Sequence, residues 1–497
     1  MKLSTRLGPV GNAIVALAAM TLSASANAGP ASCANRVNNT HAKLLECVTV
    51  EGVREHQAAF QEHADANGGI RTSGTPGYQA SVDYVAGKMR AAGYQVVVQP
   101  FQYQTFINLS PAILEQVSPP PAGPVVNNIM TYSGSGDVTA RVSTVAAITG
   151  CNASDFAGFP AGNIALISRG ACTFASKATN AFNAGATGVI IYNNGPGALN
   201  GTLSNLFTLN IGVTGVTLEV GQALAATPDL VMRLKTDTFR GIATSYNVLG
   251  ESKDGDPKTV VMAGAHLDSV DAGPGIQDNG SGSAAILETA LQMAKVKPRN
   301  KLRFAWWGAE ESGLVGSTYY VNNLPQAEQD RVALYLNFDM IGSPNYVYFI
   351  YDGDDSEGVG AGPGPDGSAA IEQLFEDFYI QRALRFKPTD FSGRSDYGPF
   401  IAVGIPSGGL FTGAEGIKTA EEVTFWGGTA GTQYDPCYHL ACDNYDNISL
   451  TALAVNSHAV AYSILQYAMN VQSITGKRGK GNFRRPVPEY LGSRQQR

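Results

Sequence analysis

Three mostly apolar runs in the second half of the chain are each followed within three residues by titratable residues. The runs cover residues 259–265, 301–307 and 332–338, and the residues that follow them are His266, Glu310 with Glu311, and Asp339. Short runs of this kind are typical of strands buried on both faces of a parallel sheet. Ligands bind at the carboxyl ends of the strands in such sheets, so we expect these four side chains to meet at one edge.

Helical and apolar patterns alternate on both sides of a region with a different character. Residues 53–64 and 78–92 have helical spacing, whereas residues from about 109 to 240 form short β-rich runs separated by proline and glycine. This order predicts an α/β domain interrupted by a β-rich domain. We assign residues 29–112 and 241–475 to the first and residues 113–240 to the insertion.

The two ends of the chain differ from the rest. A basic start, an apolar stretch over residues 13–22 and the small residues Ala26-Asn27-Ala28 are typical of a signal peptide over residues 1–28. We therefore expect export to the periplasm or the medium after cleavage near Ala28. No later segment is apolar enough over sufficient length to span a membrane. Residues 476–497 form a basic tail that we expect to be flexible.

Composition limits the class of protein. The chain has 497 residues, of which 44% are apolar and 15% charged, and its formal charge is −7. This composition is ordinary for a globular protein with ample core, and the negative charge disfavours a nucleic-acid partner. We expect a monomer.

Six cysteines fall into three local pairs along the chain, which is the pattern of an exported protein with disulfide bonds. Proximity favours the bridges Cys33–Cys47, Cys151–Cys172 and Cys437–Cys442. Six cysteines allow fifteen connectivities, so other pairings stay open.

Two histidines and three acidic residues form a candidate ligand set for two metal ions. Asp278 lies in a loop before an expected helix and is suited to bridge the two ions. His266 and Asp339 would complete one site, and Glu311 and His439 the other. Imidazole and carboxylate ligands without thiolate suit zinc, with cobalt or manganese as substitutes.

Three further residues have expected catalytic roles. Glu310 is next to a ligand but points elsewhere, so it is the natural general base. Asp268 can accept the second ring N–H of His266 and fix its orientation. Tyr438 precedes His439 and is a candidate donor to a developing oxyanion.

The motifs around these residues resemble the M28 zinc aminopeptidases. They read His-x-Asp-Ser, Asp-Asn-Gly-Ser-Gly, Ala-Glu-Glu-x-Gly-x-x-Gly-Ser, Asn-x-Asp-Met-Ile-Gly and Cys-Tyr-His. The resemblance implies a mixed sheet flanked by helices, two zinc ions on the five ligands above, Glu310 as the base, and a Cys437–Cys442 bridge beside the site. It also implies that Arg394 lies near the main chain of the substrate and that Phe411 walls an apolar pocket.

The insertion resembles a protease-associated (PA) domain. The match rests on residues 162–174, on Lys177 and on residues 184–193. Such domains shape access to neighbouring peptidases and carry no catalytic residues, as the resemblance implies.

Taken together, these features predict a secreted two-zinc aminopeptidase. It would use a hydroxide shared by the metals to remove N-terminal residues, preferably large and apolar, from peptides with a free amine. The alternative is a metallo-carboxypeptidase of the glutamate carboxypeptidase type, which would need a basic pocket where Arg394 is one candidate. A receptor that has lost its metal ligands is disfavoured, because all five ligands and the base are present.

Overall fold

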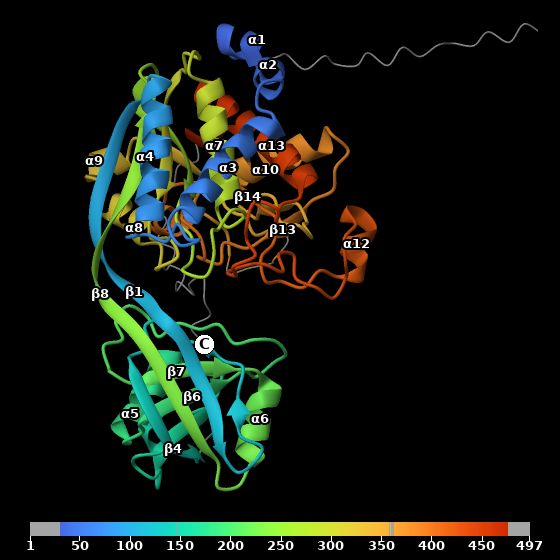
Figure 1. The fold of residues 1–497 in the computed structure, drawn as a ribbon. Coiled ribbons are helices and arrows are strands. Elements are labelled where there is room, and N and C mark those ends of the chain that lie inside the picture. Colours follow the sequence, from blue (N-terminus) through green and yellow to red (C-terminus); the bar gives the residue numbers. More distant parts are fainter. Residues whose placement is uncertain (1–29, 147, 357, 359–361, 476–497) are drawn as a thin grey trace, which may run out of the picture.

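The computed structural model describes residues 30–475, except residues 147, 357 and 359–361. The predicted signal peptide and the basic tail lie outside the described residues. Within them, the chain forms two bodies joined by a long two-stranded ribbon (Figure 1). The strands of the ribbon are β1 (Gln95–Ser118) and β8 (Val231–Glu251), which pair antiparallel over most of their length.

The larger body has a mixed sheet at its centre. From the ribbon outward its strands follow the order β8, β10 (Asn300–Trp307), β9 (Asp256–His266), β11 (Val332–Phe338), β14 (Ser407–Phe411), β12 (Phe349–Tyr351) and β13 (Lys387–Thr389). The central strands β10, β9, β11 and β14 run parallel, whereas β8 and β12 run antiparallel to their neighbours in this group.

Helices cover both faces of this sheet because alternate residues of each strand point to opposite sides. Val261 and Ala263 of β9 face one layer, and Val260 and Met262 face the other. The first layer contains α3 (Val50–Asp65), α4 (Pro76–Ala91), α7 (Gly280–Gln292), α10 (Ser368–Ile380) and α13 (Leu450–Met469). The second contains α8 (Val315–Asn322) and α11 (Tyr397–Ala402).

Short helices complete the larger body. They are α1 (Pro30–Asn35), α2 (His41–Leu45), α9 (Gln326–Gln329), α12 (Ala420–Trp426) and α14 (Gln472–Thr475). None of the helices in the described part of the chain is long and apolar enough to cross a membrane.

The smaller body is built on the C-terminal part of β1 and the N-terminal part of β8 (Figure 1). Its sheet continues from β8 through β4 (Gly136–Thr144), β5 (Ile164–Ser168), β6 (Gly188–Tyr192), β7 (Gly212–Val216) and β3 (Asn128–Ile129), and β2 (Gly123–Pro124) pairs with β1. The short helix η1 (Ala153–Phe156) and the helices α5 (Phe174–Asn183) and α6 (Leu218–Ala226) pack around it. This arrangement confirms the expected α/β fold with an inserted second body.

The ribbon differs from the sequence expectation in one respect. The predicted boundaries after residues 112 and 240 fall inside β1 and β8, which pass from one body to the other as continuous strands. The register of the pair shifts between Asn108 and Ser110 and again before Ile113. No loop therefore separates the two bodies. They meet within the ribbon, at the place where its strands change the neighbours with which they pair.

All three predicted disulfides are confirmed. Cys33 pairs with Cys47, Cys151 with Cys172, and Cys437 with Cys442, and the described residues contain no free cysteine. The histidines outside the candidate site, His41, His56, His63 and His458, lie in helices.

Candidate active site

One pocket in the larger body collects nearly all the predicted site residues. Its lining includes His266, Asp278, Glu310, Glu311, Asp339, Arg394, Phe411, Tyr438 and His439. Asp268 is fully buried and is not among the residues that line this pocket. Residues that are up to 173 positions apart in sequence therefore meet in one place.

The parallel strands explain much of this convergence. His266 is the last residue of β9 and pairs in register with Trp307, the last residue of β10. Glu310 follows β10 by three residues, and Asp339 immediately follows β11. The carboxyl ends of neighbouring parallel strands lie at one edge, as the sequence pattern predicts.

Asp278 lies between two groups of potential ligands. Its Oδ1 is 3.2 Å from His266 Nε2, and its Oδ2 is 3.0 Å from His439 Nε2. Asp339 Oδ1 approaches the first histidine to 3.3 Å, and Glu311 Oε2 approaches the second to 3.3 Å. Two overlapping triads share Asp278, and in each triad the ligand atoms lie within 4.8 Å of one another.

Several atoms of this group are buried without a hydrogen bond. They include Asp339 Oδ1 of the first triad and His439 Nε2 of the second. A buried polar atom without a partner is costly, so such a group calls for an ion. The residues present therefore fit a pair of dications with imidazole and carboxylate ligands.

The orientation of His266 is fixed by its second nitrogen. Nδ1 lies 3.2 Å from the carbonyl oxygen of Asp268, and only a protonated Nδ1 can make this bond. Nε2 then keeps its lone pair for the ligand group. We expected the Asp268 carboxylate to be the partner, but its Oδ1 is 3.7 Å away and accepts the N–H of Glu310 instead.

Glu310 occupies a position suited to proton transfer. Its side chain lines the pocket although the residue is only 3% exposed. Burial, together with the neighbouring carboxylates of Glu311 and Asp396, raises the pKa of Glu310 well above its ordinary value. A raised carboxyl pKa favours a group that can hold a proton between two transfers.

Tyr438 and His439 form one wall of the pocket. Their rings stack with centroids 3.8 Å apart, and the Cys437–Cys442 disulfide closes the loop that carries them. Burial raises the pKa of Tyr438 well above its ordinary value, so the phenol keeps its hydrogen. Arg394 Nη2 donates to the Tyr438 hydroxyl oxygen over 3.3 Å.

Three residues beside the site adopt a left-handed backbone conformation without being glycine. Ala309 has φ 53°, Met340 has φ 52° and His439 has φ 59°. Such conformations cost about 1 kcal/mol or more each and concentrate at functional sites. They turn the chain sharply beside Glu310, Asp339 and at His439 itself, which no pattern in the sequence indicates.

Arg71 is a site residue that sequence reasoning missed. It is fully buried, and its guanidinium donates to the carbonyl oxygens of Leu267, Pro274 and Gly275. Arg71 thus holds the loop between His266 and Asp278. Burial lowers its pKa to about 10, and the carboxylates of Asp268, Asp443 and Asp278 favour its charged form.

Two other supporting carboxylate contacts were also missed. Asp443 accepts the main-chain N–H groups of Gln277 and Asp278, at 2.8 Å and 3.0 Å. Ser395 donates to Asp339 Oδ2 over 2.6 Å. Burial and the nearby Asp435 raise the pKa of Asp443 to about 8. Asp443 directly follows Cys442, four residues after the Cys-Tyr-His motif, and this position was the available signal.

Comparison with known sequences supports the resemblance of both bodies. The profile of Peptidase family M28 matches residues 247–464, and the profile of the PA domain matches residues 135–224. An aminopeptidase of Pseudomonas aeruginosa is 48% identical over 436 residues, which cover 84% of this chain and 81% of the relative. Leucine aminopeptidase 2 of Trichophyton rubrum is 42% identical over 438 residues, with 86% of each chain covered.

Comparison with solved structures agrees with the sequence comparisons. The aminopeptidase from Aneurinibacillus sp. strain AM-1 superposes with a TM-score of 0.69 at 28% identity, covering 91% of this chain and 99% of that one. A zinc aminopeptidase from Bacillus subtilis superposes with a TM-score of 0.64 at 26% identity, covering 87% and 98%. Together with the metal-ligand geometry, these matches show that the chain belongs to peptidase family M28, as a metallo-aminopeptidase with a PA domain.

Proposed function

We propose that this aminopeptidase holds two zinc ions on His266, Asp278, Glu311, Asp339 and His439. The observation that carries the proposal is the position of Asp278, which directs one carboxylate oxygen to each histidine. Each half of the ligand group then contains one imidazole and one further carboxylate. This donor set suits zinc, and cobalt or manganese can substitute. The Bacillus subtilis relative is described as a zinc enzyme.

Zinc, when bound, supplies a Lewis acid that acidifies water and polarises the peptide carbonyl. The chain supplies the proton transfers. Glu310 takes a proton from the attacking water and delivers it to the leaving amine, a role that its buried position in the pocket lining supports. Asp268 holds His266 through its carbonyl oxygen and receives the N–H of Glu310, so it aligns ligand and base together.

Tyr438 stabilises the oxyanion that forms at the carbonyl carbon. Tyr438 lines the pocket beside His439, and its hydroxyl stays protonated because burial raises its pKa. A donor placed where negative charge develops contributes more to the transition state than to the bound substrate.

The substrate is a peptide with a free N-terminus and a large apolar first side chain. Glu310 and Asp339 line the pocket as acceptors for the α-ammonium group. Met340, Tyr351 and Phe411 give the pocket an apolar wall. Arg394 borders the main chain of the substrate. The Trichophyton relative is named for leucine, which agrees with this preference.

The carboxypeptidase alternative has weaker support. It needs a cation for the free carboxylate of the substrate, and Arg394 lines the pocket. Arg394 is already paired with Glu415 over 2.6 Å, so its charge is largely offset. The relatives are also named as aminopeptidases.

We further propose that the protein is exported, monomeric, and divided into a peptidase domain (residues 29–112 and 241–475) and an inserted domain (residues 113–240). The three disulfides support an oxidising compartment. The match of the PA profile inside residues 113–240 supports the division. N-terminal sequencing of the exported protein tests cleavage near Ala28, and light scattering tests the monomer.

Zinc content and substrate selectivity test the proposed function. We expect two zinc ions per chain by elemental analysis, and cleavage of leucine p-nitroanilide but not of its N-acetyl form. A chelator should abolish the activity and added zinc should restore it. His266→Ala and His439→Ala should each lower the zinc content to about one ion per chain. One zinc ion in the active wild type would contradict the two-ion site.

A further inference from the structure

Glu415 is not among the residues that line the pocket, and the proposed reaction assigns it no step. It follows β14, and its Oε1 accepts a hydrogen bond of 2.6 Å from Arg394 Nη1. The other terminal nitrogen of Arg394 donates to the hydroxyl oxygen of Tyr438. Glu415, Arg394 and Tyr438 therefore form a line of hydrogen bonds that runs from the partly exposed rim to a phenol in the pocket.

The backbone keeps Glu415 at a set distance from the segment that leads to Tyr438. The neighbours of Glu415 on both sides accept hydrogen bonds from that segment: Asp435 N–H donates to Ala414 O, and Tyr434 N–H donates to Gly416 O. The Cys437–Cys442 disulfide constrains the same segment. Main-chain hydrogen bonds and the disulfide thus hold the segments of Glu415 and Tyr438, the two residues that Arg394 contacts, in a fixed relation.

The chemistry of the three side chains fixes which group donates each hydrogen bond. A guanidinium can only donate, and a phenol has one hydrogen and two acceptor sites. Because Arg394 occupies an acceptor site on the Tyr438 oxygen, the phenolic hydrogen must point elsewhere, and Tyr438 lines the pocket. Accepting a charge-assisted bond also polarises the phenol and strengthens it as a donor.

We propose that Glu415 and Arg394 are positioning residues for the aminopeptidase reaction, acting through Tyr438. Glu415 fixes the guanidinium, and the guanidinium directs the Tyr438 hydrogen toward the carbonyl oxygen of the scissile bond. This inference rests on the proposed role of Tyr438 as the oxyanion donor.

Two simpler interpretations predict different results. If Arg394 only binds the main chain beyond the scissile bond, its loss affects peptides but not leucine p-nitroanilide, which has no second residue. If the Arg394–Glu415 pair is an ordinary partly exposed ion pair, with side chains 28% and 31% exposed, its loss changes little.

A double-mutant cycle separates these cases. Tyr438→Phe, Glu415→Gln, Arg394→Met and the two doubles that contain Tyr438→Phe are assayed on leucine p-nitroanilide and on a leucyl dipeptide. We expect Tyr438→Phe to lower kcat about 100-fold. Glu415→Gln and Arg394→Met should each lower kcat about tenfold on both substrates with little change in KM, and neither should cause further loss in the Tyr438→Phe background.

A matched ion pair elsewhere serves as the control. Glu328 at α9 pairs with Arg331, and their side chains are 34% and 31% exposed. Glu328→Gln should leave kcat unchanged. The zinc content and melting temperature of every variant are measured, and Arg394→Met provides a second test if Glu415→Gln is unstable.

Each outcome has one meaning. Additive losses, a loss confined to the dipeptide, or an unchanged kcat in both Glu415→Gln and Arg394→Met would overturn the inference while leaving the zinc site and the role of Tyr438 intact. An unchanged kcat in Tyr438→Phe would reject the oxyanion role itself, and the inference with it. Non-additive losses on both substrates support it.

Discussion

The two bodies of this molecule use the same structural device with different side chains. In the peptidase body the parallel strands β9, β10 and β11 lead into His266, Glu310 and Asp339. In the PA body the parallel strands β5, β6 and β7 lead into Arg169, Asn193 and Thr217. The second set serves structure: Arg169 donates to the Asn193 side chain, and Thr217 caps α6. Strand ends therefore provide a place for chemistry, and the residue types decide whether chemistry occurs.

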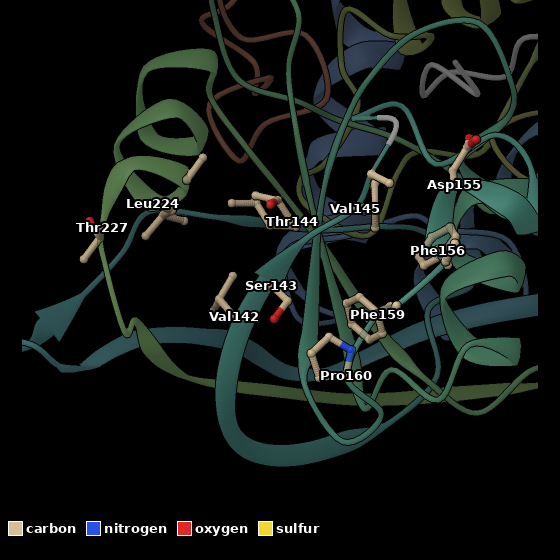
Figure 2. Close-up of a pocket in the computed structure, with 15 residues that line it drawn as sticks. Val142, Ser143, Thr144, Val145, Asp155, Phe156, Phe159, Pro160, Leu224 and Thr227 are labelled. Carbon is tan, nitrogen blue, oxygen red and sulfur yellow. The ribbon is translucent and has the colours of Figure 1, made fainter.

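The pockets of the two bodies also differ in the titratable residues that line them. The PA pocket has a volume of about 470 Å³, and Figure 2 shows the end of β4 facing both the 155–160 segment and the end of α6. Asp155 is the one titratable side chain among the described residues of this lining, and its carboxylate accepts the N–H of Asn152. A roomy pocket without converging titratable groups gives no basis for catalysis.

The largest expected contrast comes from removing one buried aspartate in each body. Asp278→Asn should lower kcat/KM about 10⁴-fold and remove zinc, because Asp278 lies between both ligand groups. Asp155→Asn should keep kcat/KM within about twofold of the wild type and cost about 1 kcal/mol of stability, through its cap on η1. Kinetics, elemental analysis and urea unfolding measure these effects. A large loss of activity in Asp155→Asn would break the contrast.

Within the peptidase body, two adjacent carboxylates should behave differently. Glu310→Gln should lower kcat about 10³-fold and keep the zinc, because this side chain is the proposed base. Glu311→Gln should lose zinc as well as activity, because Glu311 belongs to a ligand triad. Zinc content and single-turnover kinetics distinguish the two. Equal zinc loss in both variants would contradict the division of roles.

Removal of the metal should increase local opening in the peptidase body and leave the PA body unchanged. Without zinc, the buried carboxylates around Asp278 repel one another, so the loops that carry them should open more often. We expect amide hydrogen exchange to increase about tenfold or more in residues 266–280 and 437–443 after chelation. Peptides from β5 and β6 should be unchanged. Matching increases in the PA body would show that the ribbon transmits the disturbance.

The smallest expected effect is a pH dependence confined to the PA body. Burial lowers the pKa of Lys177 to about 8, and its ammonium donates to Thr149 O. Between pH 8 and 10.5 the unfolded chain holds this proton and the folded chain does not, so stability should rise with pH. The effect should be on the order of 1–2 kcal/mol, since the site is partly screened.

Hydrogen exchange of β5 and β6 peptides across this pH range measures that rise in stability, with β9 and β11 peptides as internal reference. Lys177→Met should flatten the dependence in the PA body. A dependence that persists in the variant would assign it to another group.

Sequence patterns predicted the elements that carry the site more closely than the contacts between them. The run over residues 332–338 is the strand β11 with the same ends, and the three local cysteine pairs are the observed disulfides. Both depend on local chemistry: a continuous apolar run must be buried, and nearby cysteines close small loops. Arg71 was missed because it contacts residues about 200 positions away, and its own loop has no distinctive pattern.

The sequence by itself determined which side chains stand at the ends of the buried strands, because strand alternation and turn residues are local properties. Only the tertiary structure decided how those side chains are held. It gave the second nitrogen of His266 to the Asp268 carbonyl oxygen and placed Glu415 behind Arg394 and Tyr438. Such choices depend on contacts between segments that are distant in sequence, such as Glu310 with Asp268 and Arg394 with Tyr438, and these contacts form only when the sheet, the loops and the disulfides pack together.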